Sequence, residues 1–540
     1  MPISEDVDVN LLPYGNPDFS DIREKNKIYV DKTALIYKIA CQDTPIFFSR
    51  PRRFGKSLLI NTLSNLFTDG LKNFKGLEIE KKWTDKQYSV VHLDFSSFAE
   101  KNPNELKEDL GEAIINKFKM RGIVSQKGEA GIRNPDRILD EICDMLNNNS
   151  IVLLIDEYDS PLTHHINDKD ELKEITKILN NFYSVIKQYT GKFRLIFITG
   201  VTRASHISIF SAFNNLKDLS LRDEFNSLLG FTKDELVKYF DPYIRKAAYI
   251  LKMSVDSVYR KLEHYYDGFQ FSLNASETIY NPWSILSFLD SPQLGFYNYW
   301  FESGGTPSII LQYLKISDRF DFLDYKNRNL SIEMHKISRK YEISDIPRNI
   351  LLYQAGYFTL RNENDGNALL VLPNIEVEES LLLLYLEENS LDPSDKLSKK
   401  MKDLINAIDS RNLLFIVDVF NQILNECVSN LSQIFNDERS IRDIIYAALI
   451  KIPLLQKIKE RESAKGKSDL KLITDKTCMV IEFKRTYKYR NPAASLQKAL
   501  EQLQINRYGL MFSNTHELFR VGMVISTEKK MILPEFCKEI

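Results

Sequence analysis

Short apolar runs alternate with helical patterns in the first 200 residues, and this alternation constrains the fold more than any other feature of the chain. The apolar runs lie at 46–48, 90–95, 151–155 and 195–198. Between them, segments such as 106–118 and 172–186 carry apolar residues at helical spacing. Alternating strands and helices form parallel sheets covered by helices on both faces. The sequence therefore predicts an α/β domain at the N-terminus.

The first apolar run leads into a loop of the phosphate-binding type. Residues 50–57 read RPRRFGKS, and an amphipathic pattern follows. The usual form is G-x-x-x-x-G-K-[ST], so Arg50 stands where the first glycine is expected. In such a loop Gly55 lets backbone N–H groups approach phosphate oxygens, Lys56 neutralises phosphate charge and Ser57 ligates Mg²⁺. The loop predicts binding of ATP with Mg²⁺ in a P-loop NTPase sheet.

Acidic residues end the third apolar run. Asp156 and Glu157 follow Ile155 directly. We expect Asp156 to hold Mg²⁺ and Glu157 to polarise the attacking water. Thr202 and Arg203 follow the fourth run, and at the end of a neighbouring strand they could sense the γ-phosphate. The two motifs in this order favour a nucleotide hydrolase.

One further positive charge is expected near the γ-phosphate. Arg203 is a candidate internal arginine finger, and Arg52 and Arg53 are alternative sources of that charge. Two other interpretations stay open. The loop could be a basic surface turn beside a solvated acidic pair, or it could bind ATP with little hydrolysis.

Several motifs resemble a known family. The segments YVDKT (29–33), FSRPRRFGKS (48–57) and ITGVT (198–202) are similar to the predicted AAA-ATPase-like family of bacteria and their mobile elements. Further similar segments lie at 229–232, 266–269 and 280–285. In that family an arginine-rich loop is the norm, so the resemblance implies that Arg50 is not a local defect. Members are commonly joined to a C-terminal PD-(D/E)XK nuclease-like domain.

A second group of charged residues lies near the C-terminus. Asp469 precedes a short apolar segment, and residues 479–484 read MVIEFK. Side chains alternate along a strand, so Glu482 and Lys484 share one face while Phe483 points to the core. A hairpin can bring Asp469 beside Glu482, where two carboxylates would hold Mg²⁺, with Mn²⁺ as a substitute. Lys484 would orient the nucleophilic water.

The D-x(12)-E-x-K spacing resembles the PD-(D/E)XK nuclease superfamily, with Ser468 in place of the nominal proline. By that resemblance Glu460 supplies a further acid from the preceding helix, with Glu462 as the alternative. Gln504 belongs to a Q-x-x-x-Y element that would line the site, and Gln502 competes with it. The resemblance implies a C-terminal α/β domain with a metal-dependent phosphodiesterase site.

Charge supports a nucleic-acid ligand only locally. The formal net charge is -2, so the whole chain carries no electrostatic signal for nucleic acid. Residues 451–490 hold twelve basic and five acidic residues, about +7 in all. We interpret the ligand as nucleic acid, with DNA preferred. No apolar run approaches the roughly 18 residues of a membrane span, and no signal-peptide pattern is present, so a cytoplasmic protein is expected.

These observations predict four parts. Residues 1–230 form a P-loop AAA/STAND-like ATPase domain, and 231–375 form a helical lid that could include a winged-helix module. Residues 376–436 form a helical connector and 437–540 a PD-(D/E)XK nuclease-like domain. A homo-oligomer is compatible with this organisation. The tryptophans are interpreted as core or interface anchors: Trp83, Trp283 and Trp300.

Three functions remain in competition. The first is an ATP-regulated, Mg²⁺-dependent deoxyribonuclease in defence or mobile-element conflict. The second is an ATP-dependent binding switch whose nuclease fold only grips nucleic acid or protein. The third is a nuclease whose ATPase part is purely structural. We favour the first because both sites keep their charged residues.

Overall fold

The computed structural model describes residues 7–203, 216–302, 310, 330–339, 341, 343–362, 367–388, 395–428, 438–450, 456–458, 469–487, 491–505 and 516–540. Backbone contacts divide the chain into two compact units. The N-terminal unit runs up to Ser380, and the C-terminal unit begins at Leu381. Both units are α/β, and the division into four domains stays a prediction.

A five-stranded parallel sheet organises the N-terminal unit. The four predicted strands are β1 (Ile46–Ser49), β2 (Ser89–Asp94), β3 (Ile151–Asp156) and β4 (Phe193–Gly200), and β5 (Lys217–Asp218) adds an edge. The order is β2-β3-β4-β1-β5, and every pair is parallel. Strands β1 and β3 are buried at every position, as expected for a sheet covered on both faces. Their C-terminal ends lead into the loop at 50–55 and the acidic pair.

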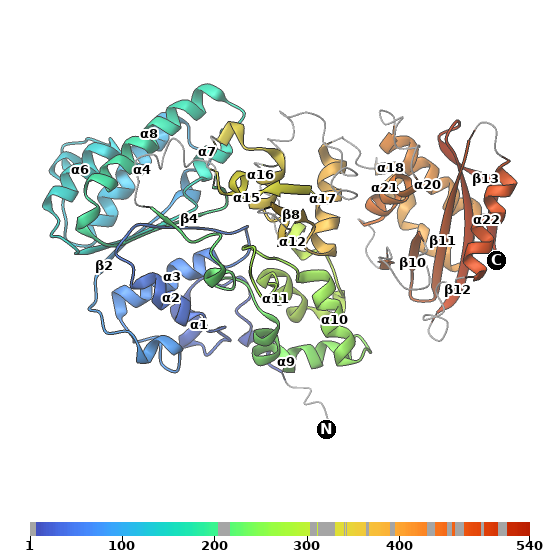
Figure 1. The fold of residues 1–540 in the computed structure, drawn as a ribbon, viewed down its shortest axis with the longest axis horizontal. Helices are drawn as coiled ribbons and strands as arrows, with labels where there is room; N and C mark the ends of the chain where they lie inside the picture. Colours follow the sequence, from blue (N-terminus) through green and yellow to red (C-terminus); the bar gives the residue numbers. More distant parts are fainter. Residues whose placement is uncertain are drawn as a thin grey trace. The chain divides into compact units, whose positions relative to one another are not determined.

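Helices cover both faces of this sheet (Figure 1). On one face lie α1 (Phe19–Glu24), α2 (Thr33–Ala40) and α3 (Lys56–Asp69). On the other lie α4 (Pro103–Lys119), α6 (Pro135–Met145) and α8 (Lys169–Gln188). Helix α4 begins at a capping box in which Asn102 and Glu105 bond each other's backbone N–H groups. The helices predicted at 106–118 and 172–186 are therefore confirmed.

Helices of the middle region pack against the N-terminal segment. This subdomain comprises α9 (Lys233–Ile250), α10 (Val255–Tyr266), α11 (Pro282–Asp290) and α12 (Tyr299–Glu302). Its apolar core joins Phe240 and Leu262 to Leu12 and Val30 from the start of the chain. The N-terminal segment thus contacts both the helical subdomain and α3.

The middle region also contains a small antiparallel sheet. Strands β6 (Leu330–Glu333), β7 (Thr359–Asn362) and β8 (Asn367–Val371) pair in the order β6-β8-β7. Helices α15 (Met334–Ser338) and α16 (Arg348–Gln354) lie between β6 and β7 in sequence. The succession strand, helix, helix, strand, strand supports the winged-helix interpretation. We refer to these five elements as the β6–β8 module.

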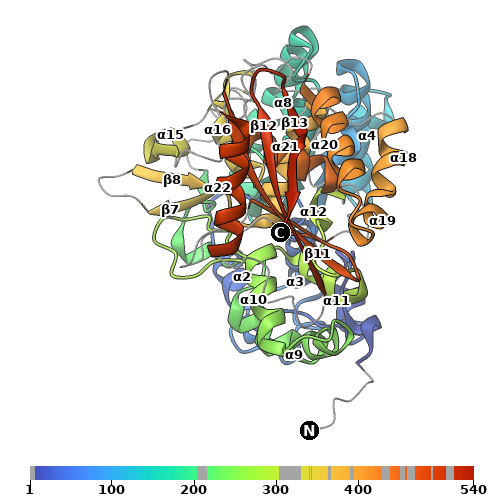
Figure 2. The ribbon, with the colours of Figure 1, turned by 90° about the vertical axis from the view of Figure 1, so that its right-hand side faces the viewer.

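The C-terminal unit is a second α/β fold. Its sheet has the order β13-β12-β11-β10-β9, with β11 and β12 parallel and the other pairs antiparallel. Helix α22 (Pro492–Ile505) lies along one face, and α20 (Leu413–Val428) and α21 (Glu438–Ile450) lie on the other (Figure 2). Helices α18 (Asp395–Lys402) and α19 (Leu404–Asp409) precede them. The strands are β9 (Gln456–Ile458), β10 (Leu470–Ile473), β11 (Thr477–Thr486), β12 (Glu517–Ser526) and β13 (Met531–Glu539).

The leucine run at 381–384 is buried within α17 (Ile375–Glu388), as expected for a core helix. Within the described residues, no helix combines the length and the apolar character that a membrane crossing requires.

A buried carboxyl group anchors the start of α17. Glu376 accepts hydrogen bonds from the Ser284 hydroxyl (2.7 Å) in α11 and from the Trp300 backbone N–H (3.0 Å) in α12. Burial raises the pKa of Glu376 to about 8, although these hydrogen bonds oppose the shift. The group joins three helices of the N-terminal unit at the cost of burying an acid.

Glu376→Gln should make stability less dependent on pH. Because the folded-state pKa lies above the ordinary 4.5, folding favours the protonated acid, and stability falls as pH rises from about 4.5 to 8. The variant lacks this loss. Its free energy of unfolding relative to the wild type should therefore rise between pH 5 and 8.5, by at most about 1.4 kcal/mol for each unit by which folding raises the pKa. Urea denaturation at both pH values measures it. An equal difference between the two proteins at pH 5 and pH 8.5 would contradict the buried acid.

Candidate functional sites

The loop between β1 and α3 has the backbone of a phosphate cradle. Gly55 adopts φ 100° and Arg53 φ 68°, so both lie in the left-handed region. No atom lies within 4 Å of the place where a Cβ of Gly55 would stand. Gly55 is the N-cap of α3, so the first N–H groups of this 14-residue helix face that open space. The loop can therefore receive an anion at the positive end of α3.

Lys56 and Ser57 connect the loop to its surroundings. The Lys56 ammonium is buried and donates to the carbonyl oxygens of Arg50 and Pro51, both at 3.1 Å. Burial lowers the pKa of Lys56. The Ser57 hydroxyl donates to Oδ2 of Asp156 at 2.9 Å. The fold thus brings together a hydroxyl and a carboxylate that lie 99 residues apart, as a shared Mg²⁺ site requires.

The acidic pair is held at the end of β3. Asp156 is 3% exposed, and burial raises its pKa to about 6 in spite of the neighbouring Lys56. Glu157 adopts φ 47°, an uncommon conformation for a residue with a side chain. The Glu157 backbone N–H donates to Oδ1 of Asp156 at 2.9 Å. Glu157, Lys56 and Ser57 line one pocket.

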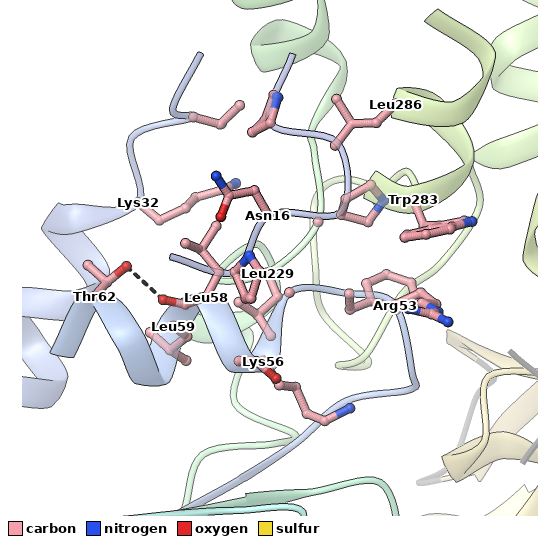
Figure 3. A pocket seen from close by; sticks show the side chains of 18 of the residues that line it. Asn16, Lys32, Arg53, Lys56, Leu58, Leu59, Thr62, Leu229, Trp283 and Leu286 are labelled. Carbon is pink, nitrogen blue, oxygen red and sulfur yellow. Dashed lines mark hydrogen bonds between the residues drawn. The ribbon is translucent and has the colours of Figure 1, made fainter. Parts of the chain in front are cut away.

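This pocket has a volume of about 580 Å³ and opens beside the loop (Figure 3). Arg52, Arg53 and Gly55 contribute to its wall. Its remaining wall is largely apolar and comes from the N-terminal segment, α3 and the helical subdomain, including Pro13, Ile28, Leu58, Leu229 and Leu286. The volume lies in the usual range for a small-molecule site. A cavity of this size, with a phosphate cradle at one end, fits a nucleoside triphosphate.

Aromatic and cationic side chains gather at the pocket wall. The Arg53 guanidinium lies over the Trp283 ring, 4.4 Å from its centroid, and the two are side by side in Figure 3. The Tyr14 ring lies 4.8 Å from Trp283. Trp83 and Trp300 are buried, as the anchor interpretation expects, whereas Trp283 lines the pocket.

Arg50 explains why this loop tolerates the missing first glycine. Its guanidinium is buried between the rings of Phe48 (4.3 Å) and Phe271 (4.2 Å). It donates to the carbonyl oxygens of Ser49, Ser220 and Phe225. Burial lowers its pKa to about 9. Arg50 therefore has a structural role, and its side chain points away from the pocket.

Thr202 and Arg203 lie outside the pocket wall. Asp159 accepts hydrogen bonds from the Thr202 backbone N–H (2.6 Å) and hydroxyl (2.7 Å). Arg203 pairs with Asp218 at 2.7 Å and donates to the Ile337 carbonyl at 3.0 Å. These hydrogen bonds and the ion pair connect the end of β4 to neighbouring segments of the fold. Arg52 and Arg53 are the candidate cations that line the pocket.

Sequence reasoning missed Asp159 because it carries no motif spacing of its own. Its signal is Gly200, which leaves room for the side chains of Tyr158 and Asp159. A Cβ on Gly200 would stand 2.5 Å from Oδ1 of Asp159 and 2.6 Å from the Tyr158 ring. The Tyr158 hydroxyl also donates to the Thr202 carbonyl at 2.8 Å. The acidic turn is thereby locked to the end of β4.

The second site lies where β10 meets β11. Leu470 pairs with Ile481, and Asp469 N–H donates to the Ile481 carbonyl at 3.2 Å. Continued by one residue, this register places Asp469 opposite Glu482 on the same face of the sheet. Oδ2 of Asp469 accepts the Phe483 backbone N–H at 2.8 Å. The structure thus brings the two predicted carboxylates together.

Lys484 completes this cluster. Its ammonium lies 2.7 Å from Oε1 of Glu482, which is 1% exposed. Glu482 and Lys484 therefore share one face of the sheet, as predicted. Phe483, which lies between them in the sequence, is fully buried. The Arg442 guanidinium of α21, which sequence reasoning missed, lies 3.7 Å from Oδ1 of Asp469. Two carboxylates are thus neighbours of two basic groups.

Helix α22 covers the face that carries Glu482. Glu482 pairs with Gly522 of β12, and a Cβ there would stand 3.0–3.3 Å from Leu496, Ala499 and Leu500 of α22. Gly522 therefore admits the helix close to the sheet. Gln504 is exposed near the end of α22, one residue after Leu503, which packs on Cys478 and Val480 at the opposite end of β11 from Lys484. The structure does not bring Gln504 to the carboxylates.

A divalent cation fits the donor set of this cluster. Mg²⁺ is commonly bound through one or two carboxylates and several waters, and Asp469 and Glu482 are two such groups on adjacent strands. Within the described part of the chain, no group of three His, Cys, Asp or Glu residues converges. Glu460, the predicted third acid, lies outside the described residues, as do Glu462 and Ser468.

Two arginines should differ sharply when replaced. Arg203→Ala removes the ion pair with Asp218 and the bond to the Ile337 carbonyl, so we expect a loss of about 2–3 kcal/mol in the free energy of unfolding without nucleotide. Arg53 is exposed, so Arg53→Ala should change stability by less than about 1 kcal/mol but weaken nucleotide binding. Thermal unfolding and calorimetric titration with ATPγS separate the two effects. Equal stability of the two variants would argue against the buried pairing of Arg203.

Comparisons with known proteins agree with the two predicted families. A family described as predicted AAA-ATPase matches residues 13–210, and the PD-(D/E)XK nuclease superfamily matches residues 436–535. An uncharacterised protein from the vnfD 5′ region of Azotobacter chroococcum mcd 1 is 30% identical over 387 residues, which are 70% of this chain and 71% of that protein. The chain therefore belongs to the predicted AAA-ATPase family and carries a C-terminal domain of the PD-(D/E)XK nuclease superfamily.

Proposed function

We propose that this protein is an ATP-regulated, Mg²⁺-dependent nuclease that acts on DNA, in defence or in conflict between mobile elements. The observation that carries the proposal is the cluster at β10 and β11. Asp469 and Glu482 are opposite each other, and Lys484 lies 2.7 Å from Glu482. Two carboxylates on neighbouring strands, with a basic side chain beside one of them, suit cleavage of a phosphodiester.

Each residue of the cluster has a distinct role in this proposal. Mg²⁺ bound there would polarise a phosphate oxygen and supply an activated water. The Phe483 N–H donates to Oδ2 of Asp469, and Oδ1, which faces Arg442, would meet the cation. The Lys484 ammonium, 2.7 Å from Oε1 of Glu482, would orient water or steady the phosphate charge. Arg442, 3.7 Å from Oδ1 of Asp469, adds a second positive charge beside the carboxylates.

The nucleotide site supplies the proposed control. The loop at 50–57 holds phosphates through backbone N–H groups and Lys56, while Ser57 and Asp156 would share Mg²⁺. Glu157 and either Arg52 or Arg53 would act on the γ-phosphate, because these side chains line the pocket. Hydrolysis would then limit how long the nuclease is active.

A binding switch with an inactive nuclease fold is the second candidate. It is favoured by one observation: in the described residues both carboxylates already lie beside a basic group, Arg442 or Lys484. Such a protein would hold nucleic acid in a salt-sensitive manner without cutting it.

Asp469→Ala should abolish cleavage, while Lys484→Ala should separate metal binding from cleavage. Loss of a metal ligand is expected to reduce the rate about 100-fold or more. Removing the Lys484 ammonium leaves both carboxylates, so Mn²⁺ affinity should stay equal or rise while cutting is lost. The assays are plasmid and single-stranded DNA cleavage with Mg²⁺ or Mn²⁺, and Mn²⁺ titration by calorimetry. Undiminished cutting by the Asp469→Ala protein would end the nuclease proposal, and binding without cutting by the wild type favours the switch.

Lys56→Ala tests the regulation. Losing a charge-assisted contact to phosphate should weaken ATPγS binding about 10-fold to 100-fold. The dependence of cleavage on ATP, ADP or no nucleotide should then vanish, while Mn²⁺ binding to the C-terminal site is unchanged. Cleavage by wild type that does not depend on nucleotide would show that the ATPase domain serves structure alone.

A further inference from the structure

The end of α16 and the residue pair that follows it touch both loops of the nucleotide site. We call residues Tyr353–Gly356 the 353–356 corner; it belongs to the β6–β8 module. Its residues are buried. Burial raises the pKa of the Tyr353 hydroxyl to about 12, and the neighbouring Arg203 and Arg50 oppose this shift. The corner is therefore near both Arg50, which begins the phosphate loop, and Arg203, which follows β4.

The first contact is between Gly356 and Pro51. Gly356 adopts φ 92°, and a Cβ there would stand 2.8 Å from Cβ and 2.9 Å from Cγ of Pro51. Real Cβ atoms do not approach other atoms so closely, so the Pro51 ring occupies the space that a glycine leaves. Pro51 lies inside the phosphate loop, one residue after Arg50.

This contact reaches the phosphate-binding lysine in one step. The carbonyl oxygens of Arg50 and Pro51 are the two acceptors of the Lys56 ammonium. Pro51 is buried, and Arg50 is clamped between two aromatic rings, so neither acceptor can shift alone. A Cβ at position 356 would therefore press on the residue whose carbonyl oxygen is one of the two acceptors of Lys56.

The second contact is between Gln354 and the end of β4. The Arg203 backbone N–H donates to Oε1 of Gln354 at 3.1 Å. The preceding residue, Thr202, is held by Asp159, which lies two residues after Glu157. The same corner thus meets the phosphate loop on one side and the strand beside the acidic pair on the other.

We propose that the 353–356 corner is a positioning element of the nucleotide site, which sets Lys56 through Pro51 and the end of β4 through Gln354. It rests on the proposed nucleotide binding and adds its regulation. Linkage is reciprocal, so nucleotide in the pocket changes the β6–β8 module, and any partner that displaces the module changes nucleotide affinity.

Gly356→Ala and Gly295→Ala form a matched test. Both glycines have positive φ, 92° and 77°, but no atom lies within 4 Å of a Cβ on Gly295. Both substitutions place a side chain on a residue with positive φ, and only Gly356→Ala also presses on Pro51. We expect ATPγS to bind Gly356→Ala about tenfold more weakly than wild type by calorimetry, and Gly295→Ala within about twofold. Near-wild-type affinity of a folded Gly356→Ala protein would overturn the proposal.

Amide hydrogen exchange distinguishes a positioning role of the corner from a merely structural one. With ATPγS, exchange in residues 348–360 of the wild type should slow, although none of them lines the pocket. This change should be absent in Lys56→Ala and smaller in Gln354→Met, which keeps the length of the side chain but removes the acceptor. Slowing of exchange confined to the pocket residues would overturn the proposal. If Gly356→Ala does not fold, the hydrogen-exchange measurement alone tests the proposal.

The failure of the underlying function looks different. If ATPγS binds neither the wild type nor the Lys56→Ala protein, the nucleotide site itself is wrong. If ATPγS binds the wild type tightly and amide exchange in residues 348–360 does not change, nucleotide binding is supported and only the positioning role of the corner is wrong.

Discussion

Compensated burial of charge at the end of β1 is the constraint on which the N-terminal unit depends. A buried ammonium or guanidinium is tolerated only where other groups replace the water it loses. Lys56 finds two carbonyl oxygens of its own loop, and Arg50 finds three carbonyl oxygens and two aromatic faces. These bonds determine the path of the loop from β1 to α3. The same path leaves the N–H groups of α3 facing an open pocket.

The C-terminal unit meets the same constraint with opposite charges. Glu482 is buried within a sheet, where an isolated carboxylate would be costly. Lys484 lies two residues further along the same strand and therefore on the same face, so it can partner Glu482. Asp469 is held by a backbone N–H and faces Arg442 from α21. In both units the groups that stabilise the buried charge are those that chemistry at the site would use.

Much of both sites could be predicted because short-range geometry places the residues. A loop followed by a helix puts Gly55, Lys56 and Ser57 at one helix end, and strand alternation puts Glu482 and Lys484 on one face. Arg203 is different. Its position after β4 is compatible with a pocket-facing role, yet its side chain pairs with Asp218 and meets α15. Local pattern could not choose between these, because the competing partners lie 15 and 134 residues away. Gln504 is similar, since only the packing of α22 decides which of its faces is exposed.

Residue type and local spacing were sufficient for the alternation of strands and helices, the phosphate loop, the acidic strand end and the carboxylate hairpin. Those features depend on hydrophobic period, backbone freedom at glycine and the two-residue repeat of a strand, all of which act within a few residues. Contacts between distant segments decided the rest. They are the packing of aromatic rings on Arg50, the hydrogen bonds from Ser57 to Asp156 and from Thr202 to Asp159, and the packing of Pro51 against Gly356. Such contacts arise because burial forces each polar group to find whichever partner the folded chain brings near, and no local pattern names that partner.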